Sequence, residues 1–231
     1  MRLAIMQPYF LPYIGYFQLM AAVDKLVLLD TVTYIKGGWV NRNRLLVADA
    51  VKWLTVPLLH SSSNKRICDL EIASDELWKK RTLRTIEQSY AKTPYAGRWI
   101  AWSEASLSSA TGRLSEFLYA TLVSLRDSFR LDCEIVPTDE HYGTDGLAGV
   151  ERLVSICRQE NADTYVNPIG GQSLYSREQF TSCGIDLCFL QATIPEFEIR
   201  GQATGDLSIL HLLMHMEVDA VSKLCKTVRY K

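Results

Sequence analysis

Residues 2–30 decide the fold of this chain and read RLAIMQPYFLPYIGYFQLMAAVDKLVLLD. The apolar run RLAIM (2–6) stops at a Gln-Pro pair, which is typical of a buried strand. Apolar residues then recur at roughly helical spacing over residues 14–23, and KLVLLD (25–30) reads as a second buried strand. This order predicts a βαβ unit, with its loop at the carboxyl end of the first strand.

The remaining chain repeats strand and helix patterns. Short apolar runs predict strands at residues 52–58, 67–72, 133–137, 164–166 and 185–190. Helical patterns cover residues 75–130, 147–161 and 206–225, and residues 31–49 read as an irregular hairpin around Gly37-Gly38. The sequence therefore predicts a single α/β domain over residues 1–231. Its sheet is Rossmann-like (nucleotidylyltransferase-like), parallel or mixed, with a helical middle insert at about 75–130.

Composition excludes several classes of protein. The chain has 231 residues, of which 48% are hydrophobic and 22% charged, so it can build a core and is not disordered. Charged residues interrupt every apolar stretch, and the start MRLAIMQPYF lacks a secretory signal. We therefore expect a cytoplasmic protein with no membrane partner. Its six cysteines form no CxxC pair and predict small buried side chains, not a zinc site.

Charge is spread unevenly along the chain. Residues 1–115 hold 15 Lys and Arg against 9 Asp and Glu, whereas residues 116–231 hold 10 against 17. The electropositive first half suits an anionic partner, such as a phosphorylated small molecule or a nucleotide. Chance asymmetry of a solvated surface is the alternative.

The loop after the first predicted strand is a candidate binding site. Ligands of open α/β sheets bind outside the carboxyl ends of strands, where a helix amino terminus also favours anions. We therefore expect Gln7, Pro8 and Tyr9 to contact substrate. Gly15 in the first helical turn would let a ligand approach closely, although simple packing also explains a glycine there.

The same loop has the register of the HxGH motif of nucleotidylyltransferases. Here the four positions read Tyr13-Ile14-Gly15-Tyr16, so the glycine is present and both histidines are absent. A neutral tyrosine cannot replace a cationic histidine on a phosphate that is being transferred. The similarity favours a related fold and argues against ordinary nucleotidyl transfer.

A second cluster runs from Lys36 to Arg44. An extended strand here would place Arg42 and Arg44 on one face and Asn41 and Asn43 on the other. Because both faces are polar, we expect this strand to line a cleft or an edge, with the arginines binding phosphate or carboxylate. A solvated turn with surface ion pairs is the alternative.

Three further features are candidates. Asp30, at the carboxyl end of the second strand, is the one acid that we nominate as a general base. Asn167, Gly170 and Gly171 follow a strand and could present N–H groups to an oxyanion, although a plain turn explains them equally. His211 and His215 share a helix face but lack the glutamate of HExxH, so core histidines are favoured over a metal.

A basic helix face is the feature that would suit nucleic acid. Lys79, Lys80, Arg81 and Arg84 lie on it, with Trp78 and Tyr90 as candidate stacking groups. Such a face is usually only solvated, and the pI of about 6.4 argues against a dedicated nucleic-acid binder.

Several blocks resemble the WbqC-like protein family. MQPYFLPYIGYF, VDKLVLLDTVTYIK, NRNRLL and WLTVPL resemble its opening, and YVNPIGGQSLY, GIDLCFL and GDLSILHLLMHM resemble its close. The match covers, residue by residue, Gln7, Pro8, Pro12, Gly15, Tyr16, Asp24, Asp30, Lys36, Asn41, Arg42, Asn43, Arg44, Gly170 and Tyr175. The chain departs from the family at His211 and His215, where the family has an acid and an asparagine-like residue.

The resemblance implies a transferase for activated sugars or amino acids in a bacterial tailoring pathway. We expect Lys36 to stabilise the leaving group, and Asp30 or Tyr16 to orient or deprotonate an incoming amine or hydroxyl. The expected substrate contacts are Gln7, Pro8, Tyr9, Gly15, Asn41, Arg42, Asn43, Arg44, Asn167, Gly170, Gly171 and Tyr175. Nothing in the residues identifies a cofactor. The alternatives are a non-catalytic nucleotide-binding module and a transferase that modifies a base in nucleic acid.

Overall fold

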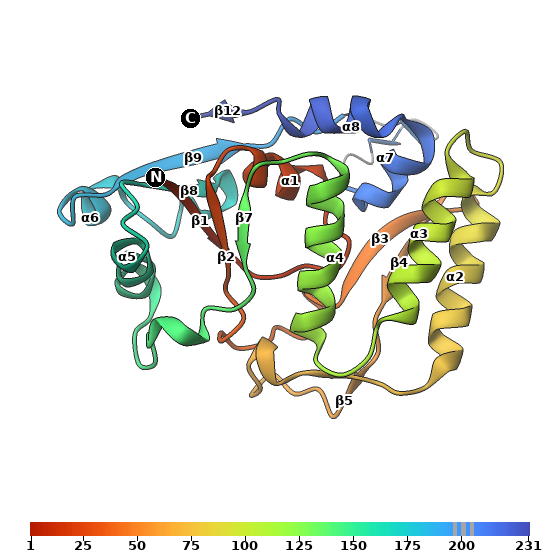
Figure 1. Cartoon of the computed structure of the whole chain (residues 1–231), viewed down its shortest axis with the longest axis horizontal. Coiled ribbons are helices and arrows are strands. Elements are labelled where there is room, and N and C mark those ends of the chain that lie inside the picture. The colour runs from red at the N-terminus through yellow and green to blue at the C-terminus, as the bar shows by residue number, and fades with distance from the viewer. Residues whose placement is uncertain (196–197, 200–201, 204–205) are drawn as a thin grey trace.

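A six-stranded sheet forms the centre of the protein, seen in a computed structural model that describes residues 1–195, 198–199, 202–203 and 206–231 (Figure 1). The strand order is β12-β9-β8-β1-β2-β7. The strands are β1 (Arg2–Met6), β2 (Lys25–Leu28), β7 (Glu134–Val136), β8 (Thr164–Pro168), β9 (Asp186–Gln191) and β12 (Arg229–Tyr230). Five of them pair in parallel, and β12 pairs antiparallel with β9 at one edge. The expected α/β fold with a mixed sheet is confirmed.

The predicted βαβ unit is present at the amino terminus. Helix α1 (Ile14–Ala21) connects β1 to β2, and Met6 lies opposite Leu28 in the parallel register. From β2 the sheet continues to β7, whereas β8 and β9 lie on the other side of β1. The strand order thus reverses between β1 and β8, which is where open α/β sheets form a ligand crevice.

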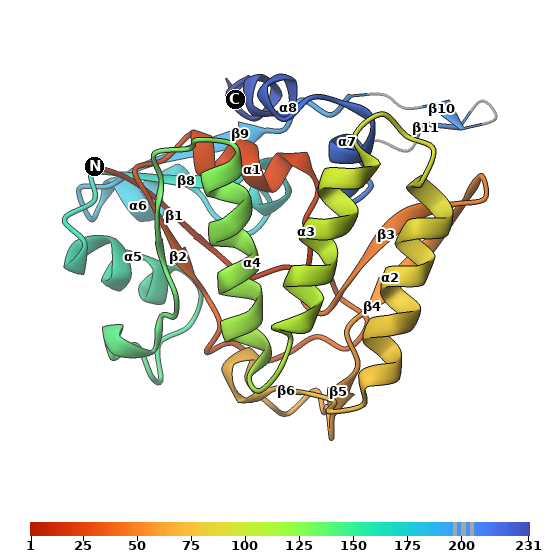
Figure 2. The same ribbon diagram turned by 45° about the vertical axis from the view of Figure 1, so that its right-hand side comes forward.

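Two hydrophobic cores cover the two faces of the sheet, because successive strand residues point to opposite sides. On one face, α1 packs with α4 (Leu114–Ser128) and with the carboxyl-terminal helices α7 (Ile209–His215) and α8 (Val218–Cys225). The other face is covered by α5 (Gly149–Gln159) and α6 (Arg177–Thr181), together with the short helix η2 (Glu140–Tyr142) (Figures 1 and 2). The predicted helix 206–225 is interrupted, since Met216 is extended between α7 and α8.

Three helices occupy the middle of the chain, as predicted for residues 75–130. They are α2 (Glu76–Tyr90), α3 (Ala96–Ser108) and α4 (Leu114–Ser128). The Asp75 side chain caps α2 by accepting from the Leu77 N–H. Phe129, directly after α4, packs edge-on against Phe17 of α1 with ring centroids 5.0 Å apart. The helical insert therefore shares the core of the sheet.

A separate hairpin, β3 (Arg42–Val47) and β4 (Ala50–Thr55), stands beside α2 (Figure 2). The predicted strand 67–72 is only partly a strand. Residues Ile67–Asp69 form the short helix η1, because Ile67 and Leu70 are both fully buried and three residues apart. The short strands β5 (Leu58–Leu59) and β6 (Glu71–Ile72) pair with each other.

The remaining elements are short. They are η3 (Ile169–Gly171), β10 (Glu198–Ile199) and β11 (Gln202–Ala203). Among the described residues, no helix has both the length and the apolar sequence that crossing a bilayer requires.

Candidate functional site

Three of the candidate residues lie at the carboxyl edge of the central sheet. Gln7 follows β1, Asp30 follows β2 by two residues, and Asn167 lies near the end of β8. The Leu29 N–H donates to the Met6 carbonyl at 2.9 Å, so the ends of β1 and β2 stay paired up to this edge. The sheet order therefore brings together segments that are far apart in the sequence.

The loop after β1 is fastened to the segment that precedes the hairpin. The Phe10 N–H donates to the Val40 carbonyl at 3.0 Å, and the Asn43 side chain donates to the carbonyls of Phe10 and Leu11 at 3.1 and 2.8 Å. Leu11 has a φ of 43°, a left-handed backbone conformation that a non-glycine residue rarely adopts. These bonds hold the two clusters singled out from the sequence side by side.

The two asparagines of the second cluster face inward. Asn41 and Asn43 are buried, and the Asn41 amide donates to the Val56 carbonyl at 2.8 Å and accepts from the Tyr34 hydroxyl at 2.8 Å. The predicted alternation in this strand is therefore present. The second polar face of this strand consists of buried asparagine amides that donate hydrogen bonds to main-chain carbonyls.

The two arginines lie on the opposite face of β3, against two indoles. The Arg42 guanidinium is 3.9 Å from the Trp53 ring centroid and donates to the carbonyls of Gly37 and Gly38. Arg44 lies over Trp39 at 5.1 Å and forms an ion pair with Asp206. Both arginines thus have protein partners.

The Lys36 side chain is exposed in the turn before Arg42. No ion pair joins Lys36 to a residue that the structure describes. Lys36 is therefore the cation of this cluster that is most available to a ligand.

Aromatic side chains surround the start of α1. The Tyr13 ring lies over Gly15, so that an added Cβ would overlap it. Tyr16 is buried and its hydroxyl donates to the Gln7 carbonyl at 3.0 Å, while burial raises its pKa well above the usual value. Tyr9 is half-buried, 5.7 Å from the Tyr16 ring. Gly15 therefore admits an aromatic ring, and Tyr16 holds the main chain of the loop.

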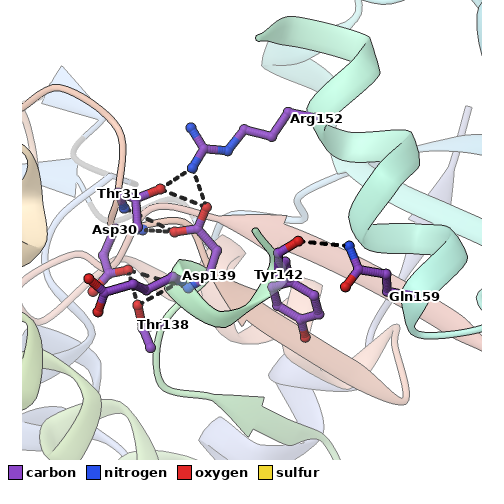
Figure 3. A network of polar contacts seen from close by, with 8 residues as sticks. Asp30, Thr31, Thr138, Asp139, Tyr142, Arg152 and Gln159 are labelled. Atoms are coloured by element: carbon purple, nitrogen blue, oxygen red, sulfur yellow. Dashed lines mark hydrogen bonds and ion pairs between the residues drawn. The ribbon is translucent and has the colours of Figure 1, made fainter. Parts of the chain in front are cut away.

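A buried polar network surrounds Asp30 (Figure 3). One Asp30 oxygen accepts from the Thr138 hydroxyl at 2.6 Å. Asp139 follows β7 and is itself 1% exposed; its carboxylate accepts from the N–H groups of Asp30 and Thr31 at 3.0 and 2.9 Å. Arg152 of α5 forms an ion pair with Asp139 at 2.7 Å. The network fixes the backbone at the carboxyl end of β2.

The Asp30 carboxyl has an unusual proton affinity. Burial, together with the negative charge of Asp139, raises its pKa from 3.8 to about 6, although the Thr138 hydrogen bond acts in the opposite sense. A side-chain hydrogen bond with the Asp139 carboxyl also raises this pKa. A buried carboxyl with a pKa near neutrality is suited to exchange a proton.

Sequence reasoning did not identify four members of this network: Thr31, Thr138, Asp139 and Arg152. The polar Thr-Asp pair directly after the predicted strand 133–137 was a usable signal, because side chains at strand carboxyl ends gather at one edge. The buried Cys68 also lies near Asp30, and its N–H donates to the Asp30 carbonyl at 2.8 Å. Burial raises the pKa of the Cys68 thiol to about 11, so it is a thiol at neutral pH.

The end of β8 and the turn that follows it hold three of the predicted binding residues. Asn167 is 6% exposed, and its Nδ2 has no hydrogen-bond partner among the described residues. Gly171 lies directly against this amide, and an added Cβ would overlap it, whereas Gly170 faces open space. Tyr175 packs edge-on against Phe180 with centroids 6.1 Å apart. This segment thus places an unpaired amide near the point where the strand order reverses.

The histidine pair and the basic helix were the less favoured candidates for ligand binding. His211 is buried, with Nδ1 3.1 Å from the Tyr90 hydroxyl, and burial lowers its pKa to about 4. In the part of the chain that the structure describes, no three His, Cys, Asp or Glu side chains are placed to hold a metal ion. Trp78 and Tyr90 are both buried, and Lys79 pairs with Glu76 at 2.8 Å. The expected stacking groups are therefore not accessible.

Comparison with known proteins places this chain in a family. The sequence profile of the WbqC-like protein family matches residues 7–223. The chain belongs to the WbqC-like protein family. It is also similar to the uncharacterized protein Rv1507c of Mycobacterium tuberculosis (strain ATCC 25618 / H37Rv), with 27% identity over 95% of each chain. No solved structure matches it. The family match includes the loop after β1, Asp30 and the segment after β8, which lie at the sheet edge described above.

Proposed function

We propose that this WbqC-like protein is a group-transfer enzyme that acts on a phosphorylated or nucleotide-activated substrate. The observation that carries the proposal is the Asp30 carboxyl, buried at the carboxyl end of β2 with a pKa raised to about 6. A structural carboxyl is normally stabilised in its charged form, whereas the pKa of the Asp30 carboxyl lies close to neutral pH.

The activated donor would lie over the loop after β1. Lys36 and Arg42 would supply positive charge to the donor, and Gln7 and Tyr9, which belong to the loop itself, would contact it. Lys36 would stabilise the charge that develops on the leaving group. Removing such an electrostatic contact typically lowers turnover about 100-fold or more.

The acceptor would be an amine or a hydroxyl, for which an amino acid is our preferred class. Its nitrogen or oxygen attacks the activated carbon of the donor and forms the new bond. The bond between this carbon and the phosphate-bearing leaving group breaks, the leaving group departs with the electron pair, and the acceptor proton passes to the Asp30 carboxylate. A positioned base of this kind contributes about 10²–10⁴-fold to rate. Asp30 suits this role better than Tyr16, whose hydroxyl already donates to the Gln7 carbonyl.

The test starts with a ligand screen of the full chain. Thermal shifts against nucleotides, sugar nucleotides and amino acids select a donor and an acceptor, and mass spectrometry then detects a joined product. We expect Asp30→Asn to bind the donor normally and to lose turnover at least 100-fold. Lys36→Met should weaken donor binding and turnover with an unchanged melting temperature, because its side chain is exposed.

The outcome separates the competing functions. Tight binding of a nucleotide by wild type, with no product from any donor and acceptor pair, would select the non-catalytic binding module. Full activity of Asp30→Asn would refute the assigned base. A nucleic-acid substrate would instead be shown by a product on an oligonucleotide and by binding that collapses as salt is raised.

A further inference from the structure

A groove between the hairpin β3–β4 and helix α2 carries an inference that is independent of the transfer chemistry. It has a volume of about 380 Å³ and an apolar floor. Its polar walls are formed by Lys52 of β4 and by Arg81, Thr82, Thr85 and Gln88 of α2. None of these five residues belongs to the candidate transfer site.

Two cations share this groove without a neutralising acid. Lys52 pairs with Leu45 in the hairpin register, which places it on the face that turns toward α2. Arg81 lines the groove from the helix, and no Asp or Glu is among the lining residues. Neither cation forms an ion pair with a residue that the structure describes. Like charges that share a cavity repel each other, and a bound anion would remove this repulsion.

The neighbouring polar groups are also donors. The Thr82 side chain is buried, and its hydroxyl has no hydrogen-bond partner among the described residues. Gln88 adds an amide two turns further along α2. A guanidinium, an ammonium, a hydroxyl and an amide together form a donor set suited to phosphate oxygens.

We propose that this groove binds the phosphoryl group of a small phosphorylated ligand. Its volume exceeds that of a phosphate, so it can also hold a small organic part of the ligand. The buried Leu45 and Leu54, which also line the groove, offer an apolar surface to that part.

Isothermal titration of the full chain with inorganic pyrophosphate tests the site. Lys52→Met and Arg81→Met should each raise the dissociation constant about tenfold, because each substitution keeps an apolar side chain and removes one positive charge. The matched controls are Lys80→Met and Arg84→Met, which remove charges from α2 outside the groove lining. All four variants should keep the wild-type circular dichroism spectrum and melting temperature.

Four results would overturn the proposal. The first is the absence of pyrophosphate binding at millimolar concentration, and the second is equal affinity of wild type and both groove variants. The third is loss of pyrophosphate binding in Lys36→Met alone, which would place the ion at the transfer site instead. The fourth is an affinity that rises with the length of an oligothymidylate, which would assign the groove to a polymer. Asp30→Asn should bind pyrophosphate as wild type does, which keeps this test separate from that of the transfer reaction.

Discussion

Asp30→Asn should abolish group transfer and also stabilise the fold at neutral pH. The carboxyl is buried beside Asp139, and its pKa is raised from 3.8 to about 6. The folded protein therefore binds a proton at Asp30 more tightly than the unfolded chain does. The stabilisation from this proton is complete below about pH 4 and is lost as the pH rises through about 6. An asparagine keeps an oxygen for the Thr138 hydroxyl and carries no charge.

The size of the effect follows from the pKa difference. About two pKa units correspond to about 3 kcal/mol between the two ends of the titration. Roughly half of this, about 1.5 kcal/mol, develops between about pH 5 and about pH 8. For a domain of this size, the melting temperatures of wild type and variant should then diverge by about 3–6 °C over that interval.

Urea denaturation followed by circular dichroism measures the difference directly. The free energy of unfolding of Asp30→Asn, minus that of wild type, should grow as the pH is raised from about 5 to about 8. His211, which titrates in both proteins, cancels in this difference. Asp145→Asn, at an exposed position, should run parallel to wild type. A difference that does not change with pH would refute the assigned burial and proton affinity of Asp30.

Three further perturbations test the packing around the site. Arg152→Met should destabilise the protein by about 3 kcal/mol in urea titrations, because it leaves the buried Asp139 without its cation; a loss below about 1 kcal/mol would contradict this. Gly171→Ala should cost about 1–3 kcal/mol through overlap with a buried amide, whereas Gly170→Ala faces open space, and equal melting curves for the two would refute the overlap. Burial keeps the His211 pKa near 4, below its unfolded value of 6.5, so the stability that the neutral imidazole contributes is lost as the pH falls from about 6.5 toward 4, opposite in sign to the Asp30 contribution. His211→Gln should lose less over this window, and identical slopes would count against a neutral buried imidazole.

Local sequence patterns predicted much of the fold. The apolar runs on either side of residues 7–24 indicated two buried strands joined by a helix, and the structure contains this βαβ unit. Alternation correctly separated the arginines of β3 from its asparagines. Such patterns work because strand and helix periods act between residues close in sequence.

The tertiary structure decided which face of a strand is buried and which residues contact one another. The alternation of Asn43 and Arg44 could not show which face would be buried, because that depends on the Phe10 and Leu11 carbonyls more than thirty residues away. The sequence also left Tyr16 as a candidate for catalysis, whereas in the structure its hydroxyl donates to the Gln7 carbonyl.

The sequence by itself determined that Asp30 ends a buried strand of an α/β domain. Its chemistry was decided only when the sheet placed β7 directly beside β2, although 108 positions separate Thr31 from Asp139. That neighbour supplies a negative charge, and the surrounding core removes water, which together raise the proton affinity of Asp30. Periodicity cannot predict such a pairing, because the strand order depends on how the whole chain packs.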